Sequence, residues 1–340
     1  MKRNHLVWCI AILTVVALLA VLKLYQIVWR AKQQGKPSAA RLVLGCERSL
    51  LTTPVWVAEH QGYFRQSGLN LSIKEFDSGK MSLDAMLAGE ELDMCTAAQT
   101  PIMFQSFKRD DFAIVAAMVS SESDVKVLGR RDKGVIGIEQ LAGKRGGITI
   151  GTTAQFFLHI VLIYGGVPAS AVEIVDAKPS ELPHVLSEGR VDAICTWEPH
   201  ALTARQLLGE QAVTLETRNL YREDFYFVAR RDVLVADQEA VKRFLEAIGK
   251  AQEFIHEREE EAKTILCRRL GIDPQQVDAV WSEFEFGLKL DQSIFLTLEE
   301  EARWAIQAGL TDQRQVPNYL GYIFADALEQ VEPEAVQIIK

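Results

Sequence analysis

The stretch from Ile148 to Pro199 constrains the fold of this chain most strongly. It begins with a short apolar run over residues 148–150, continues through the polar segment Gly151–Gln155, and becomes a mostly apolar run that ends at Gly165-Gly166. This order is typical of a strand, a polar turn and a helix that starts at a threonine cap and ends at glycine. Repetition of the pattern further along indicates an α/β fold.

The same stretch predicts a binding site where its strands end. A second strand is expected over residues 172–175, a helix over 181–186 and a third strand over 191–195, which leads directly into Trp197 and Glu198. Ligands of open α/β sheets bind outside the carboxyl ends of the strands, and the free N–H groups of a helix start attract anions or carbonyl oxygens. The pattern therefore outlines a site without naming its ligand.

The rest of the chain repeats this organisation. Three strands are expected over residues 41–46, 69–76 and 92–96, each followed by serine, threonine, glutamine or glycine before a helix. Two internal echoes support a two-lobe arrangement. Residues 87–96 resemble residues 186–196, and residues 127–132 resemble residues 227–232. We interpret the second pair as crossover strands near 125–132 and 225–232 that link the lobes.

Hydroxyls and helix-start amides at these corners would hold an anionic head group, although for any single one of them plain helix capping is the favoured interpretation. Trp197 would stack on the ligand or pack in the core. The carboxylate of Glu198 suits an amine or amide donor on the ligand. The predicted ligand-binding residues are Ser49, Thr52, Thr53, Asp77, Ser78, Gln99, Thr100, Thr152, Thr153, Trp197 and Glu198.

No catalytic or metal-binding pattern stands out. The six histidines form no HExxH motif, there is no Gly-x-Ser-x-Gly elbow, and the glycine-rich residues 143–147 lack the spacing of a phosphate-binding loop. We therefore predict no catalytic residue, no metal and no cofactor. Whether any disulfide joins the four cysteines after residue 40 stays open. These are Cys46, Cys95, Cys195 and Cys267.

The N-terminus and the remaining chain differ in charge and hydropathy. Residues 6–29 are apolar except for Thr14, Lys23, Tyr25 and Gln26, and about 20 such residues span a bilayer. This predicts an uncleaved membrane anchor, with a cleaved signal peptide as the alternative. The first 40 residues hold six basic and no acidic residues, so residues 41–340 carry a net charge of −15. That charge argues against a nucleic-acid partner.

Five short motifs carry a family resemblance. They are Pro54–Phe64, Leu87–Gly89 with Leu92-Asp93, Gly151–Thr153, Gly189–Ala193 and Trp197–Pro199. In these the chain resembles the substrate-binding proteins of ABC importers, in the branch of sulfonate, taurine, nitrate and thiamine-precursor binders. The resemblance covers roughly residues 41–330.

The resemblance implies a type II periplasmic-binding-protein fold, α/β, with a ligand cleft between two lobes. We expect residues 1–40 to be anchor and tether, residues 41–128 and 230–340 to form lobe 1, and residues 129–229 to form lobe 2. The lobes would close over the ligand by a hinge.

The implied function is capture of a small organic solute outside the cytoplasmic membrane and its delivery to ABC permease and ATPase subunits. An aminosulfonate or a pyrimidine precursor would offer the nitrogen donor that suits Glu198. A membrane-tethered ligand sensor is a second hypothesis. A small biosynthetic enzyme on the same fold is a third.

Overall fold

The computed structural model describes residues 40–217 and 219–339, together with Lys23. Contacts divide the chain into two units, residues 1–40 and 41–340, and the fold below is that of the second unit. Apart from Lys23, the predicted membrane anchor lies outside the described residues. Within the described part of the chain, no helix combines the length and the apolar character needed to cross a membrane.

A seven-stranded mixed sheet organises the larger part of the fold, in the order β12-β11-β4-β10-β3-β1-β2. Strand β4, third in this order, is buried along its whole length. The strands are β1 (Ala40–Glu47), β2 (Leu69–Phe76), β3 (Met94–Ala98), β4 (Phe112–Ser121), β10 (Glu223–Arg230), β11 (Phe284–Asp291) and β12 (Val336–Gln337). The helices around it are α2 (Thr53–Gln61), α3 (Tyr63–Gln66), α4 (Gly79–Leu87), α5 (Gln99–Ser106), α9 (Arg231–Ala236), α10 (Gln238–Glu257), α11 (Glu259–Leu270), α12 (Pro274–Trp281), α13 (Ser293–Gln307) and α14 (Asp326–Val331).

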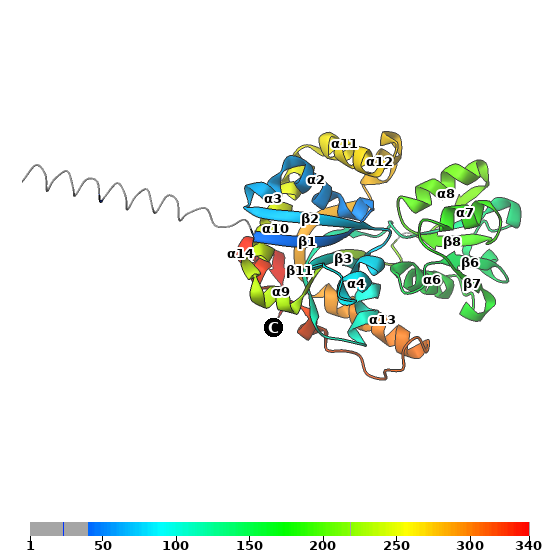
Figure 1. Ribbon diagram of the computed structural model, residues 1–340. Coiled ribbons are helices and arrows are strands. Elements are labelled where there is room, and N and C mark those ends of the chain that lie inside the picture. Colours follow the sequence, from blue (N-terminus) through cyan, green and yellow to red (C-terminus); the bar gives the residue numbers. More distant parts are fainter. Residues whose placement is uncertain (1–22, 24–39, 218, 340) are drawn as a thin grey trace, which may run out of the picture. The chain divides into compact units, whose positions relative to one another are not determined.

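A five-stranded sheet, in the order β7-β6-β8-β5-β9, organises the smaller part, drawn in green in Figure 1. Its strands are β5 (Lys126–Arg130), β6 (Arg145–Ile148), β7 (Glu173–Asp176), β8 (Ala193–Thr196) and β9 (Ala212–Thr214), and its helices are α6 (Thr153–Tyr164), α7 (Leu182–Ser187) and α8 (His200–Leu208). We call residues 126–214 the small lobe, and residues 40–121 and 223–339 the large lobe.

The chain passes between the two sheets slightly earlier than the sequence suggested. We expected crossover strands near residues 125–132 and 225–232. Strand β5 instead lies wholly in the small sheet and β10 wholly in the large sheet, so the chain crosses over residues 122–125 and 215–222. The predicted boundary at 229/230 is therefore misplaced, because it assigns most of β10 to the wrong sheet.

Strand β6 also differs from the prediction. The apolar run over residues 148–150 indicated the strand, but β6 begins at Arg145 and includes two glycines. A Cβ added at Gly147 would lie 3.1 Å from Ile194 and 3.2 Å from Leu182, so a larger residue there would force these side chains of β8 and α7 to shift. The apolar pattern gave no sign of this constraint.

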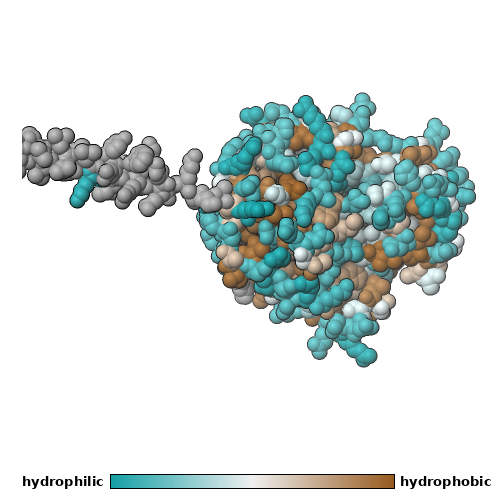
Figure 2. Space-filling model, in the orientation of Figure 1, coloured by the Kyte–Doolittle hydropathy of each residue, from teal (hydrophilic) through white to brown (hydrophobic). Residues whose placement is uncertain are grey.

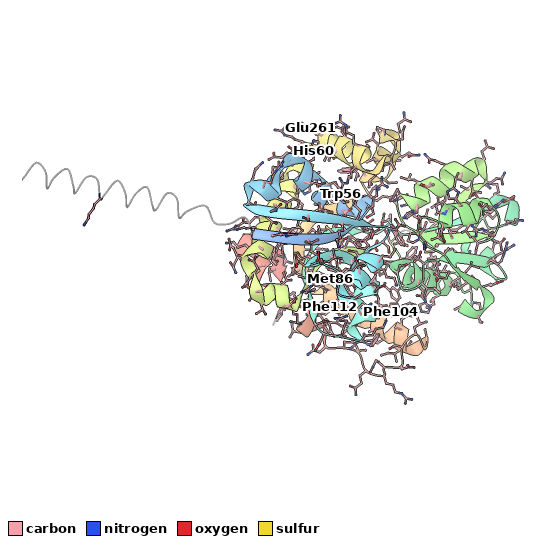
Figure 3. All side chains as sticks on the ribbon, viewed as in Figure 1. Trp56, His60, Met86, Phe104, Phe112 and Glu261 are labelled. Atoms are coloured by element: carbon pink, nitrogen blue, oxygen red, sulfur yellow. The ribbon has the colours of Figure 1, made fainter. Side chains whose placement is uncertain are left out.

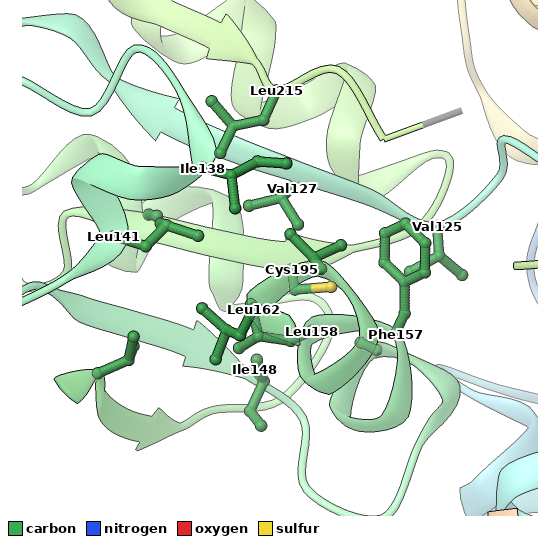
Figure 4. Close-up of a cluster of buried hydrophobic side chains, with 14 of the residues drawn as sticks. Val125, Val127, Ile138, Leu141, Ile148, Phe157, Leu158, Leu162, Cys195 and Leu215 are labelled. Atoms are coloured by element: carbon green, nitrogen blue, oxygen red, sulfur yellow. The ribbon is translucent and has the colours of Figure 1, made fainter. Parts of the chain in front are cut away.

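The small sheet is covered on both faces. Side chains alternate along a strand, so Val127 and Leu128 of β5 point to opposite sides. Val127 joins a buried cluster with Phe157 and Leu158 of α6, shown in Figure 4. Leu128 joins a second cluster with Leu182 and other residues of α7 and α8. This double coverage explains why β8, in the middle of the sheet, is buried along its whole length.

The two echoes in the sequence correspond to a structural repeat. Asp93, just before β3, accepts a hydrogen bond from the amide of Val43 at 2.8 Å, and its carbonyl accepts one from the amide of Arg230 at 3.1 Å. Asp192, just before β8, does the same. Its carboxylate accepts from the amide of Arg145 at 3.0 Å and its carbonyl from the amide of Arg130 at 3.1 Å. In each lobe, one aspartate thus ties three strands together.

Aromatic side chains connect the lobes along one side. Phe156 of α6 lies 5.0 Å from Trp304 of α13, centroid to centroid, and Trp304 also contacts Phe104 of α5. Phe104 lies on the side of the large lobe that faces α6 (Figure 3). Elsewhere the visible face is mainly hydrophilic, with apolar residues in small groups (Figure 2).

Candidate functional site

A small cavity lies between the lobes and is lined by both. Its volume is about 20 Å³, enough for roughly one water molecule. The large lobe contributes Glu47, Leu51, Ser78, Gly79, Lys80, Ala98, Pro101, Glu223 and Phe225, and the small lobe contributes Thr152, Thr153 and Trp197. A wider groove of about 730 Å³ adjoins it and shares Lys80 and Pro101. A solute larger than water could therefore enter this cavity only if the lobes moved apart.

Sheet topology brings the cavity residues together. Glu47 is the last residue of β1, which runs parallel to β3. Strand β10 runs antiparallel to β3, so its first residue, Glu223, lies at the same edge of the large sheet. In the small lobe, Thr153 begins α6 and Trp197 follows β8. In both lobes, cavity residues therefore lie at or just after the carboxyl ends of strands, as in other open α/β sheets. Glu223 is the exception, because it begins β10.

Glu47 is almost fully buried and connects the lobes. One carboxylate oxygen accepts a hydrogen bond from Nε1 of Trp197 at 2.6 Å, and the other accepts one from the amide of Gly79 at 2.7 Å. The pKa of Glu47 is raised to about 8, mainly by burial and also by the nearby Asp124, although the hydrogen bonds from Gly79 and Trp197 lower it. The Trp197 bond crosses from the small to the large lobe.

Glu223 is also buried but is less well satisfied. Only 4% of the residue is exposed, and its Oε2 has no hydrogen-bond partner among the described residues. Burial raises the pKa of Glu223 to about 8. The neighbouring Thr153 hydroxyl lowers that pKa, whereas Glu47 raises it. The cavity therefore holds two carboxyl groups whose charged forms are both disfavoured.

No cation lining the cavity compensates these acids directly. Lys80 is the basic residue among the lining side chains, and its Nζ pairs with Asp84 of α4 at 2.6 Å. Among the described residues, neither Glu47 nor Glu223 has an ion pair within 4 Å. Another hydrogen bond between the lobes, donated by the hydroxyl of Ser180 to the carboxylate of Asp77 at 3.1 Å, is exposed.

Four of the eleven predicted site residues line the cavity: Ser78, Thr152, Thr153 and Trp197. The Ser78 hydroxyl caps α4 by accepting from the amide of Met81. The Thr152 hydroxyl donates to the carbonyl of Thr149. Ser78 thus both caps a helix and lines the cavity, so helix capping does not exclude a role in ligand binding.

The other hydroxyl and amide candidates lie outside the lining, and local contacts account for several of them. Thr52 donates to the carbonyls of Glu47 and Ser49, and Thr53 donates to that of Leu50. Gln99 donates to the carbonyl of Arg222. The remaining three are Ser49, Asp77 and Thr100.

Glu198 contradicts the expectation that it faces the ligand. It is fully buried within the small lobe and does not line the cavity. One oxygen lies 2.6 Å from Nη2 of Arg205 and 3.4 Å from Nζ of Lys126, and the other accepts from the amide of Leu202 at 2.7 Å. Both oxygens are used by the protein, so Glu198 stabilises the turn into α8.

The two cavity acids were missed. Glu47 carries the signal that drew attention to Glu198, a carboxylate directly after an apolar strand. Glu223 has no such signal, because it begins a strand whose direction is visible only in the sheet. Among the described residues, no group of three metal-binding side chains occurs, and all four cysteines after residue 40 are buried and free.

The two-sheet α/β fold, with a cavity between its lobes, is that of the periplasmic binding proteins. The chain belongs to the NMT1/THI5-like family, whose family model matches residues 51–262.

Three known proteins illustrate the similarity. The taurine-binding periplasmic protein of Escherichia coli K12 is 24% identical over 220 residues, or 59% of this chain and 62% of that protein. The structure of the alkanesulfonate-binding protein SsuA of Xanthomonas axonopodis pv. citri, bound to MOPS, has a TM-score of 0.74 at 17% identity and covers 85% of this chain and 99% of that one. The desulfurization enzyme DSZB has a TM-score of 0.62 at 13% identity and covers 87% and 99%. At these identities the structures share the fold alone.

Proposed function

We propose that this protein is an extracytoplasmic solute-binding protein of an ABC importer, which captures a small polar organic solute between its lobes. The observation that carries the proposal is that both lobes line one buried cavity, and that Glu47 and Trp197 meet across it. Membership of the NMT1/THI5-like family and the similarity to a taurine-binding and an alkanesulfonate-binding protein support it.

The sequence supports the rest of the assembly. The apolar residues 6–29 would anchor the protein to the cytoplasmic membrane, and residues up to 40 would tether it. A permease and an ATPase on separate chains would receive the solute. Within the family's range, an aminosulfonate or a pyrimidine precursor best fits a cavity with carboxyl and hydroxyl groups.

An enzyme on this fold is the competing class, because DSZB shares the fold. The cavity lining holds no histidine and no cysteine. Cys46 precedes Glu47, but its thiol is buried and burial raises its pKa well above the usual range, which disfavours the reactive thiolate. We therefore propose binding without catalysis.

Thermal melting of the full chain in mild detergent tests solute capture. The panel contains sulfonates, nitrate, pyrimidines and amino acids. A solute at about 100 times its Kd stabilises the folded state by about 2.7 kcal/mol, which raises the Tm by several degrees. A shift with one chemical class supports capture. Turnover of a bound compound, detected by mass spectrometry, would favour the enzyme instead.

A further inference from the structure

We propose that the captured solute carries a positively charged N–H group, such as an ammonium or amidinium, which is held between Glu47 and Glu223. This inference rests on the proposed solute capture and specifies the charge of the group that enters the cavity. It differs from simple recognition of an anionic head group, which the names of the sulfonate-binding relatives would suggest.

The positions of the two carboxylates support this inference first. Both line the cavity, both are at least 96% buried, and they come from neighbouring regions of the same sheet edge. Oε2 of Glu223 is buried and without a partner, so it has an unused acceptor at the cavity. A buried acceptor without a donor is costly, and an N–H group on the solute would satisfy it.

The contacts of Glu47 show what kind of group it accepts. Both of its oxygens receive N–H donors, from Trp197 at 2.6 Å and from Gly79 at 2.7 Å. The Trp197 donor comes from the opposite lobe, so opening the cleft removes it. A solute with its own N–H group can then replace the indole at Glu47. The indole face beside the cavity also suits a cation.

Two other buried acids in the described part of the chain are paired with basic side chains, whereas Asp124 and Glu301, like Glu223, each keep one oxygen without a partner. Glu198 contacts Arg205 and Lys126, and Asp224 lies 2.8 Å from Nζ of Lys289. No arginine of the described residues lines the cavity, and Lys80 is paired with Asp84. An anionic group placed here would meet the two carboxyls, three hydroxyls and a lysine that is already paired. A cation would supply the charge that the wall lacks.

Binding of probe pairs that match in size but differ in charge tests the inference on the full chain. The pairs are taurine and isethionate, ethanolamine and ethylene glycol, and benzamidine and benzamide, measured by calorimetry near pH 8. We expect the protonated amine or amidine of a pair to bind at least tenfold tighter than its partner. Glu223→Gln and Glu47→Gln should each weaken that binding at least tenfold, while the exposed control Glu90→Gln changes it less than twofold.

The outcomes separate the two levels of the proposal. Tight binding of isethionate or nitrate that both glutamine variants leave unchanged would overturn the cationic group but keep solute capture. Failure of every probe, charged or neutral, to bind at its solubility limit would overturn both. Glutamine is isosteric with glutamate and removes a buried charge, so each variant should fold, which circular dichroism verifies.

Discussion

Two buried glutamates, Glu198 and Glu223, illustrate how this fold separates structure from function. Glu198 is fully buried and is held by Arg205, Lys126 and a backbone amide. Glu223 is 4% exposed, has an oxygen without a partner among the described residues, and has a pKa raised to about 8. The first arrangement stabilises the small lobe. The second is costly for the folded state, and such cost at a cleft is typical of a functional site.

The largest expected loss of stability comes from removing the carboxylate of Glu198, which is paired with two basic side chains. Glu198→Ala leaves the guanidinium of Arg205 and the ammonium of Lys126 without their shared carboxylate, so we expect the free energy of unfolding to fall by about 3–5 kcal/mol. Urea unfolding measures it. Glu188→Ala is the matched control, because Glu188 pairs with Arg190 on the exposed surface and should matter by less than about 1 kcal/mol. Equal losses in the two variants would contradict the structural role of Glu198.

Glu47 and Glu223, which have no ion pair among the described residues, should have a smaller effect on stability, and this effect depends on pH. The pKa values of Glu47 and Glu223 rise from 4.5 to about 8 on folding. The folded state therefore binds more protons than the unfolded state between these values. The stability that these carboxyls contribute is fully present below about pH 4.5 and is lost as the pH rises through about 8. The charge of Asp124 helps to raise the pKa of Glu47, and the charges of Glu301 and Asp224 help to raise the pKa of Glu223.

Glu223→Gln removes one of these titrations. We expect the variant to be more stable than the parent by about 1–3 kcal/mol near pH 9, with a smaller difference near pH 5. Urea unfolding across this range measures the difference. Parallel pH profiles for parent and variant would show that Glu223 titrates normally. The same variant should lose cationic solutes, so stability and binding should change in opposite directions.

Much of the fold could be predicted because its signals are local. The α6 helix begins at its threonines and ends at Gly165, as the sequence indicated, and the aspartate echo marked both lobes. The prediction misplaced strand β6 because Gly147 packs closely against Ile194 and Leu182, which come later in the chain. Contacts of that kind leave no mark on the apolar pattern.

The site was harder to predict, for a related reason. Glu198 was misinterpreted because its partners had to be known, and Lys126 comes from a distant strand. Leu202 and Arg205, however, lie on the first turns of α8, where helical spacing alone places them near Glu198. Glu223 was beyond prediction, since the antiparallel direction of β10 decides which of its ends meets the cavity.

The smallest expected effect tests whether the Trp197 indole competes with the solute at Glu47. Trp197→Phe keeps a ring but removes the donor to Glu47, so stability should fall by about 1 kcal/mol, the value of a typical hydrogen bond. Cationic probes should bind somewhat tighter, because they no longer displace the indole N–H. Trp56→Phe is the control, since Nε1 of Trp56 has no hydrogen-bond partner among the described residues and its ring stacks against Arg269 away from the cavity. Weaker binding of a cation to Trp197→Phe would show instead that the indole helps to hold the solute.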